Sequence, residues 1–304
     1  MSDNHHDHHH HHHSVSGKNL FITIVLNVVV TLAQIVGGII SGSLALLSDA
    51  THNLSDVLAL VIAYFANRYA AKPHSASKTF GYKRAEILAT LFNASVLFGI
   101  GVFIIIEAFH KFYHPEDVDS TWVVGLGLLG VVVNGLSVLL IKDDAHENMN
   151  IRAAYAHLLT DVMTSVAVVV GGVLMYFYQM FWIDPALSLV IAIYIIWASV
   201  GLIKESSYIL MQFAPKNIDV DELVAVIAEE PKVRNAHHVH LWSLDDRRTH
   251  LEAHLDFNEN VTLEESNEII DRLEHALRHA FDIDHATFQC EYNRKDDKSI
   301  IAHA

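Results

Sequence analysis

Two histidine–aspartate pairs stand in segments that are otherwise apolar. His52 and Asp56 are four residues apart in DATHNLSD, and His157 and Asp161 repeat that spacing in AYAHLLTD. Residues four apart lie on the same face of a helix, so each segment presents one imidazole beside one carboxylate. Two nitrogen and two oxygen donors suit a tetrahedral Zn²⁺ site. The spacing therefore predicts a metal site formed between two helices.

The residues around these pairs are apolar enough to lie in lipid. SGSLALL precedes the first pair and VLALVIAYFA follows it. A charge at the centre of a bilayer costs about 3 kcal/mol or more, so such groups pair or line a pathway. A simpler interpretation is that the four groups only bond one another and stabilise a bundle. Asp49, one turn before His52, is either a supporting partner of the site or an acid at a helix start.

The composition favours a membrane protein. Of 304 residues, 52% are hydrophobic and only 18% are charged, whereas soluble proteins have about 25% charged residues. A helix needs roughly 20 apolar residues to cross a bilayer. Six segments meet that length, at approximately 19–40, 44–68, 86–110, 121–141, 153–178 and 185–210.

The loops predict the orientation of these spans. The 68–84 and 142–152 loops carry Lys and Arg, whereas 41–43 and 179–184 carry none. Basic loops face the cytoplasm, and an even number of spans then places both termini there. We therefore expect a multi-pass membrane protein with both termini in the cytoplasm.

Charge and motifs exclude several other classes of function. The formal net charge of −15 argues against nucleic acid as a partner. Cys290 is the only cysteine, so no internal disulfide can form. The chain has no GxxxxGK[ST] loop, so transport driven by bound ATP has no support.

The composition also divides the chain into parts. Residues 1–17 are a His-rich leader, which is either an expression tag or a natural metal-collecting tail. Residues 18–213 form the expected transmembrane domain, and 214–295 a polar domain on the cytoplasmic side. Residues 296–304 are a tail.

The C-terminal part predicts a small α+β domain in the order α-β-β-α-β. A helix begins at Asp219, and a second begins at Thr262, which caps it together with Glu265. The strands are HHVHLWSL, THLEAHLDF and HATFQCEY. Such a domain packs its helices on one face of the sheet.

Strand alternation gathers many possible ligands on the other face of that sheet. Leu251, Ala253, Leu255 and Phe257 face the helices, and so do Phe288, Cys290 and Tyr292. The open face then receives His238, His240, Trp242, His250, Glu252, His254, Asp256, His285, Gln289 and Glu291. The face is either merely solvated or binds metal, and the density of imidazoles favours metal. We read His275 and His279, on the polar side of a helix, as solvated.

Taken together, these motifs resemble the cation diffusion facilitator family, most closely its bacterial zinc exporters. The resemblance runs from about residue 18 to 295. It rests on GSLALLSDATHNLSD, FGYKRAEILA, IRAAYAHLLTDVMTSV, DPALS, VRNAHHVHLWSL and HATFQCEY.

The resemblance implies a homodimeric metal²⁺/H⁺ antiporter with six spans and a ferredoxin-like cytoplasmic domain. It implies a transport site of His52, Asp56, His157 and Asp161, in which a His at the first position goes with zinc preference over cadmium. It also implies a cytoplasmic site that includes His238, His254 and Glu291, to which the open face adds His285. Gln289 replaces a His of some relatives. No site is expected in the loop that contains His74.

The expected activity is proton-coupled export of divalent cations, with Zn²⁺ as substrate and as probable regulatory ion. Metal binding requires neutral His and ionised Asp, so protons and metal compete for the same side chains. The alternative function is a metal-gated channel or a membrane metal sensor. An enzyme is not expected, because the His/Asp quartet leaves no extra general base.

Overall fold

The structure is a computed structural model that describes residues 17–70, 75–141, 149–246 and 248–301. Within these ranges, the side chains of 17–24, 56, 59–60, 62–70, 140–141, 149–154 and 156–157 lie outside the description. The leader lies outside it except for Gly17. The chain separates into two compact units, Met1–Val61 with Ser95–Ser199 and Ile62–Ala94 with Val200–Ala304. Each unit is described by itself.

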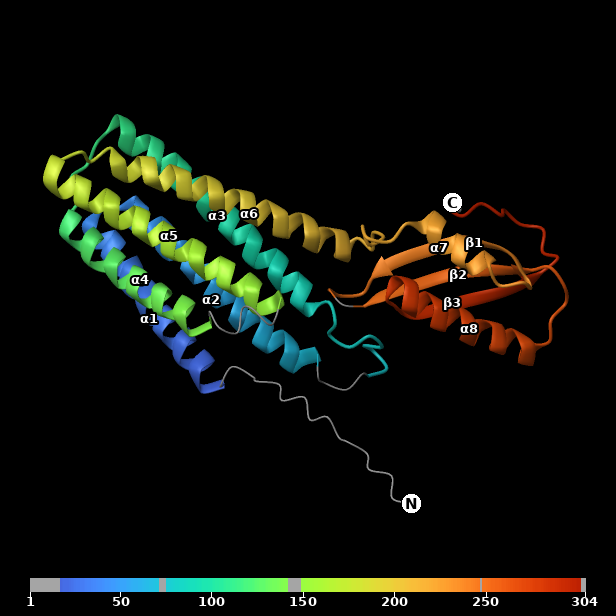
Figure 1. Cartoon of the computed structure of the whole chain (residues 1–304). Helices are drawn as coiled ribbons and strands as arrows, with labels where there is room; N and C mark the ends of the chain where they lie inside the picture. The colour runs from blue at the N-terminus through green and yellow to red at the C-terminus, as the bar shows by residue number, and fades with distance from the viewer. Residues whose placement is uncertain (1–16, 71–74, 142–148, 247, 302–304) are drawn as a thin grey trace, which may run out of the picture. The chain divides into compact units, whose positions relative to one another are not determined.

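Long helices make up the first two thirds of the described chain (Figure 1). They are α1 (Gly17–Ser41), α2 (Leu44–Ala70), α3 (Ala85–Tyr113), α4 (Ser120–Ile141), α5 (Met149–Tyr178) and α6 (Ile183–Leu210). Their bounds agree with the six predicted segments to within a few residues. In the first unit α4 packs against both α1 and α5.

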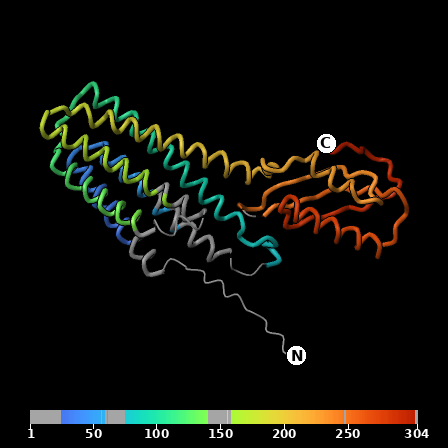
Figure 2. The backbone as a smooth tube through the Cα atoms, viewed as in Figure 1, coloured from blue at the N-terminus to red at the C-terminus, as the bar shows by residue number. Residues whose placement is uncertain are grey.

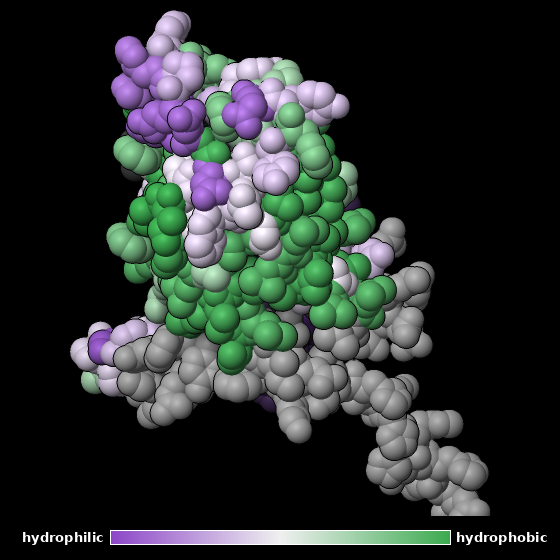
Figure 3. Space-filling model, turned by 90° about the vertical axis from the view of Figure 1, so that its left-hand side faces the viewer, coloured by the Kyte–Doolittle hydropathy of each residue, from purple (hydrophilic) through white to green (hydrophobic). Residues whose placement is uncertain are grey.

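Four stretches in the described residues are long and apolar enough to cross a membrane. They are Ala85–Tyr113, Ser120–Leu139, Leu158–Tyr178 and Ile183–Leu210, and a shorter apolar stretch covers Val25–Ser41. Large hydrophobic side chains are exposed along these helices, and hydrophobic residues cover much of the face in Figure 3. Soluble monomers rarely expose apolar areas of this extent. The helical part is therefore a membrane domain.

A buried carboxylate fixes the start of α2. Gly42 has φ = 67° in the turn between α1 and α2, a left-handed conformation that glycine adopts without strain. Asp184, at the start of α6, is fully buried and accepts hydrogen bonds from the Ser43 hydroxyl and, at 2.8 Å, from the Leu44 backbone N–H. These bonds satisfy donors that a helix N-terminus leaves unpaired. Asp184 thereby anchors the helix that carries His52.

The C-terminal part has the predicted order of elements. It consists of α7 (Val220–Ala228), β1 (Val233–Ser243), β2 (Thr249–Phe257), α8 (Leu263–Phe281) and β3 (Ile283–Tyr292). The sheet order is β1-β2-β3, with β1 antiparallel and β3 parallel to β2. Asp219 and Thr262 cap the two helices through their side chains, as expected from their positions.

The two helices cover one face of the sheet (Figure 1). The predicted inward residues Leu251, Ala253, Leu255 and Phe257 all belong to the core beneath them. The prediction of a core position was wrong for Cys290 and Tyr292, which are exposed. Cys290 does face α8 as predicted, because its Sγ atom lies 3.1 Å from the Ser266 hydroxyl, but on the edge strand β3 this position stays exposed.

The chain does not leave the domain after β3. It turns back along β1 (Figure 2), where the His238 N–H donates to the Ser299 carbonyl at 3.2 Å. The Val239 N–H donates to the Ile300 carbonyl at 2.8 Å, and Ile300 packs against the core. Residues 296–301 of the predicted tail are thus part of the folded domain.

Candidate metal sites

One histidine and one aspartate of the predicted transport site meet inside the helical unit. The His52 Nε2 atom of α2 lies 3.1 Å from the Asp161 Oδ1 atom of α5. The two residues are 8% and 3% exposed. The ring of Tyr194 in α6 stands edge-on to the imidazole, with 5.6 Å between ring centroids. We call His52 and Asp161 the helix pair.

A second link joins the same two helices one turn away. Asp49 is fully buried, and its Oδ2 atom accepts hydrogen bonds from Gln34 Nε2 and from the Ser165 hydroxyl, both at 3.1 Å. Asn53 Nδ2 donates to the Gln34 side-chain oxygen at 3.3 Å. Asp49 is therefore a buried partner in a network between helices and not a solvent-exposed acid. Its network holds α1, α2 and α5 in register beside the helix pair.

A glycine allows this network to form. A Cβ atom at Gly130 of α4 would lie 2.7 Å from Gln34 Nε2 and 3.1 Å from the Ser165 Oγ atom. Real Cβ atoms essentially never approach within 3.0 Å, so a larger residue would push the Gln34 amide aside and press on the Ser165 hydroxyl, and these are the two hydrogen-bond donors of Asp49. Gly135, further along the same helix, has open space around its own Cβ position.

The other two predicted transport residues lie on the same helices. Asp56 is one turn after His52 in α2, and His157 is one turn before Asp161 in α5. Their backbones are helical, but their side chains lie outside the described residues. His74 of the loop after α2 also lies outside them.

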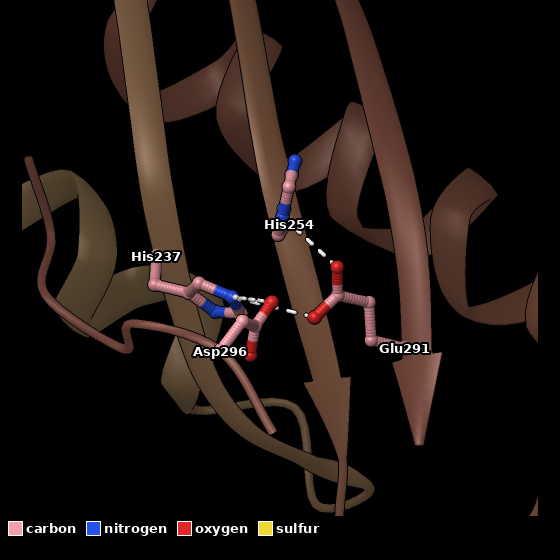
Figure 4. A group of neighbouring side chains, drawn as sticks. All are labelled: His237, His254, Glu291 and Asp296. Atoms are coloured by element: carbon pink, nitrogen blue, oxygen red, sulfur yellow. Dashed lines mark ion pairs between the residues drawn. The ribbon is translucent and has the colours of Figure 1, made fainter. Parts of the chain in front are cut away.

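A second group of possible ligands lies on the open face of the sheet (Figure 4). We call it the sheet cluster, and it consists of His237, His254, Glu291 and Asp296. One ligand atom from each lies within 4.8 Å of all the others. His254 Nδ1 is 3.0 Å from Glu291 Oε1, and His237 Nε2 is 3.4 Å from Glu291 Oε2. His237 Nε2 is also 3.6 Å from Asp296 Oδ2.

A β-bulge brings His237 into the sheet cluster. His237 pairs with His254 and His240 pairs with Glu252, so β1 has one more residue than β2 between these positions. His238, within this bulge, has φ = 51°. This is a left-handed backbone conformation that His tolerates better than most residues. Strict alternation of β1 missed His237 for this reason. The signal in the sequence was only the doubled histidine.

The predicted ligands of the cytoplasmic site fall in different places. His254 and Glu291 belong to the sheet cluster. His238 lies beside it, with its ring stacked on that of His254 at 4.6 Å between centroids. His285 lies elsewhere on the sheet, 5.3 Å from the ring of His250. Asp296 was missed because the predicted domain ended at residue 295.

Three residues of the sheet cluster have pKa values shifted toward the protonation states that metal binding requires. Burial lowers the pKa of His254 below its ordinary value, against the opposing effect of Glu291. Burial alone would raise the pKa of Glu291, but hydrogen bonds from Lys298 and Gln289 leave it lowered. A hydrogen bond from Lys298 lowers the pKa of Asp296 to about 2. Neutral imidazole and ionised carboxylates are the forms that bind Zn²⁺.

Comparison with known proteins identifies both parts of the chain. Residues 20–211 match the cation efflux transmembrane domain, and residues 215–293 match the cytoplasmic domain of cation efflux proteins.

Several relatives match almost the full chain. It is 35% identical to the "Cadmium, cobalt and zinc/H(+)-K(+) antiporter" of Bacillus subtilis (strain 168), over 93% of this chain and 92% of that protein. It is 33% identical to the "Cation efflux system protein CzcD" of Alcaligenes sp. (strain CT14), over 90% and 86%. The "Zinc transporter ZitB" of Escherichia coli (strain K12) is also 33% identical, over 86% and 83%.

The family match confirms the resemblance that the motifs indicated. It describes a multi-pass membrane protein with a cytoplasmic C-terminal domain, and a transporter, not an enzyme. The chain belongs to the cation diffusion facilitator family of cation efflux proteins.

Proposed function

We propose that this protein is a proton-coupled antiporter that exports divalent cations, most readily Zn²⁺, from the cytoplasm. The observation that carries the proposal is the direct contact of the buried His52 with the buried Asp161 between two helices of a membrane domain. An ionisable pair at such a position faces a cavity or pathway in membrane proteins. The relatives named as zinc transporters and as a metal/H⁺-K⁺ antiporter support the same substrate class.

The transport site in this proposal is the quartet His52, Asp56, His157 and Asp161. The pair that meets in the structure fixes which faces of α2 and α5 approach each other. Helical periodicity places Asp56 on the face of His52 and His157 on the face of Asp161. Two imidazoles and two carboxylates then supply a complete tetrahedral donor set.

The chemistry of the quartet couples metal to protons. Zn²⁺ binds when the imidazoles are neutral and the aspartates ionised, so binding from the cytoplasm releases protons. Imidazole titrates near neutral pH, so protons from a more acidic outer side displace the metal there. Rocking of helices around a site fixed at mid-membrane then exposes it to each side in turn.

The architecture that fits this cycle is a homodimer with six spans per chain and both termini in the cytoplasm. The six-span arrangement adds α1 and α2 to the four long apolar stretches. A ferredoxin-like cytoplasmic domain forms the dimer contact, in line with the match of residues 215–293. The membrane is the inner membrane of a bacterium.

The sheet cluster is a regulatory metal site in this proposal. Its four ligand atoms come from two imidazoles and two carboxylates, which suit Zn²⁺. The Nδ1 atom of His237, which is 1% exposed, has no hydrogen-bond partner among the described residues. Metal that binds here would join strands β1, β2 and β3 and favour transport.

Metal uptake into inside-out membrane vesicles tests the proposal. We expect Zn²⁺ uptake that rises with an imposed pH gradient, and proton movement opposite to the metal. Uptake that is indifferent to the pH gradient would instead favour a metal-gated channel, and binding without uptake would favour a sensor. Parallel assays with Cd²⁺ and Co²⁺ define the selectivity.

A further inference from the structure

The C-terminal tail places an ammonium group inside the sheet cluster. Lys298 Nζ lies 2.6 Å from Asp296 Oδ1, 3.1 Å from Glu291 Oε2 and 3.3 Å from His237 Nε2. A third carboxylate, that of Asp256, has its Oδ2 atom 3.9 Å away and is itself 4% exposed. The ammonium therefore lies among three of the four ligands of the cluster.

The backbone around Lys298 is tied to β1. Asn235 Nδ2 donates to the Lys298 carbonyl at 3.2 Å. The next two carbonyls, of Ser299 and Ile300, accept from the backbone of β1. The lysine is thus the charged end of a folded strap, in contrast to the exposed Lys295 three residues earlier. Burial alone would lower the pKa of Lys298, but hydrogen bonds to Asp296 and Glu291 raise it above its ordinary value.

We propose that Lys298 is a tethered competitor for the regulatory metal site, and that a divalent cation must displace its ammonium to bind. The inference rests on the proposed metal binding by the sheet cluster. In the metal-free protein Lys298 neutralises the carboxylates together with the more exposed Arg294, which lies 2.9 Å from Glu291 Oε1 and 3.5 Å from Asp296 Oδ2. Lys298 also closes the tail over β1. When metal binds, the ammonium leaves and the tail loosens.

Geometry and charge require this exchange. A zinc ion sits about 2.0–2.2 Å from its nitrogen and oxygen ligands. Such an ion at the centre of the cluster occupies the space that the ammonium now fills. Two cations at that separation also repel strongly in a partly buried site. Because the tail pairs with the backbone of His238, whose ring stacks on His254, loss of the lysine contact also alters the support of a ligand.

Zinc affinity of the full-length chain in detergent tests the competition. All variants carry Asp161→Asn and have the histidines of the leader replaced by serine, so that zinc at the helix pair or on the leader does not mask the sheet cluster. We expect Lys298→Met to bind Zn²⁺ at least about tenfold tighter than its parent, because a repelling charge is gone. Lys298→Arg, which keeps the charge, should stay within about threefold of the parent. Lys295→Met is the matched control and should not change the affinity.

The outcomes separate the competitor from the site itself. Equal affinities of the parent and Lys298→Met, both lost in His254→Ala, would overturn the competition and keep the metal site. Zinc binding that does not respond to His254→Ala would overturn both. Neither reading depends on transport activity, which is measured separately on the chain with Asp161 intact.

Hydrogen exchange in the unsubstituted chain provides a second measurement that needs no lysine variant. The reporters are the backbone amides of His238 and Val239, which donate to the tail. Added Zn²⁺ should speed their exchange, whereas amides in the middle of β2 should not become faster. Unchanged or slower exchange at these two amides would overturn the displacement of the tail.

Discussion

The two imidazole–carboxylate groups of this protein are neutralised in different ways. In the helix pair, the His52 imidazole meets the Asp161 carboxylate directly. In the sheet cluster, a lysine from the tail lies among the carboxylates. Under the proposed function this difference follows from the two tasks. A transport site must exchange its cation in every cycle. A regulatory site can instead keep a cation that is tethered to the chain, here the Lys298 ammonium, until metal is abundant.

The largest expected effect comes from removing a charge from the helix pair. Asp161→Asn keeps the size of the side chain but removes an anionic ligand. Loss of one partner of a buried charged pair costs roughly 3 kcal/mol or more, which corresponds to a fall of about 100-fold in binding. We expect zinc uptake by vesicles to fall by at least that factor.

Replacing a carboxylate by an amide in the sheet cluster provides the comparison with Asp161→Asn. Glu291→Gln should leave maximal uptake nearly unchanged and alter only its dependence on zinc concentration. The loss of roughly 3 kcal/mol predicts a much larger fall in uptake than tenfold. If Asp161→Asn kept more than about a tenth of the uptake, the transport site would therefore lie elsewhere.

A smaller effect should follow from crowding the network that supports the helix pair. Gly130→Ala places a methyl group against Gln34 and Ser165, both of which donate to Asp49. Overpacking of this kind typically costs about 1–3 kcal/mol. We expect uptake to fall by about tenfold with normal amounts of protein in the membrane.

Gly135→Ala provides the matched control for that variant. It adds the same methyl group to the same helix, where open space surrounds the Cβ position. Its uptake should equal that of the unsubstituted chain. Equal uptake by both glycine variants would show that the Asp49 network does not position the helix pair.

Two steps of sequence reasoning singled out the residues of the helix pair. Helical periodicity related His52 to Asp56 and His157 to Asp161, and the cost of a charge in lipid required such groups to meet between helices. Spacing by four within apolar segments placed His52 and Asp161 on inward faces, and the structure brings them into contact. The bounds of the long helices and the caps at Asp219 and Thr262 also followed from local patterns.

The sheet cluster depends on features that local patterns do not reveal. A bulge shifts β1 by one residue, so His237 takes the place that alternation gave to His238. Asp296 and Lys298 come from a segment whose position depends on long-range hydrogen bonds to β1. The exposed position of Cys290 likewise depends on β3 being at the edge of the sheet.

A helix-cap variant should separate the stability of the cytoplasmic domain from transport. The Thr262 side chain accepts a hydrogen bond from the Glu265 N–H at the start of α8. Thr262→Ala should lower the free energy of unfolding of this domain by about 1 kcal/mol. Hydrogen exchange of α8 amides measures the change, and zinc uptake should stay the same. Faster exchange together with lost uptake would mean that the two parts are energetically coupled.

The smallest expected effect concerns pH and a histidine at the other end of the open face. His250 is 8% exposed and packs against Trp242, with 5.5 Å between ring centroids. Burial, and secondly the neighbouring His285, lowers its pKa in the folded protein. When the pH falls below the ordinary imidazole pKa of about 6.5, His250 binds a proton in the unfolded chain more readily than in the folded domain. The domain should therefore be most stable above that pH and lose stability as the pH falls below it.

Comparison with a variant isolates this contribution from those of the other histidines. His250→Gln keeps a polar side chain of similar size but cannot titrate, so its stability should fall less between pH 7.5 and 5.5, values about one unit either side of the imidazole reference. Hydrogen exchange of β2 amides in metal-free protein measures the difference, which should be smaller than the effect of Thr262→Ala. Identical pH profiles would assign the acid sensitivity to other groups, the sheet cluster first among them. A flatter profile in the variant would show that His250 gives this face of the sheet a response to protons at a place separate from the sheet cluster.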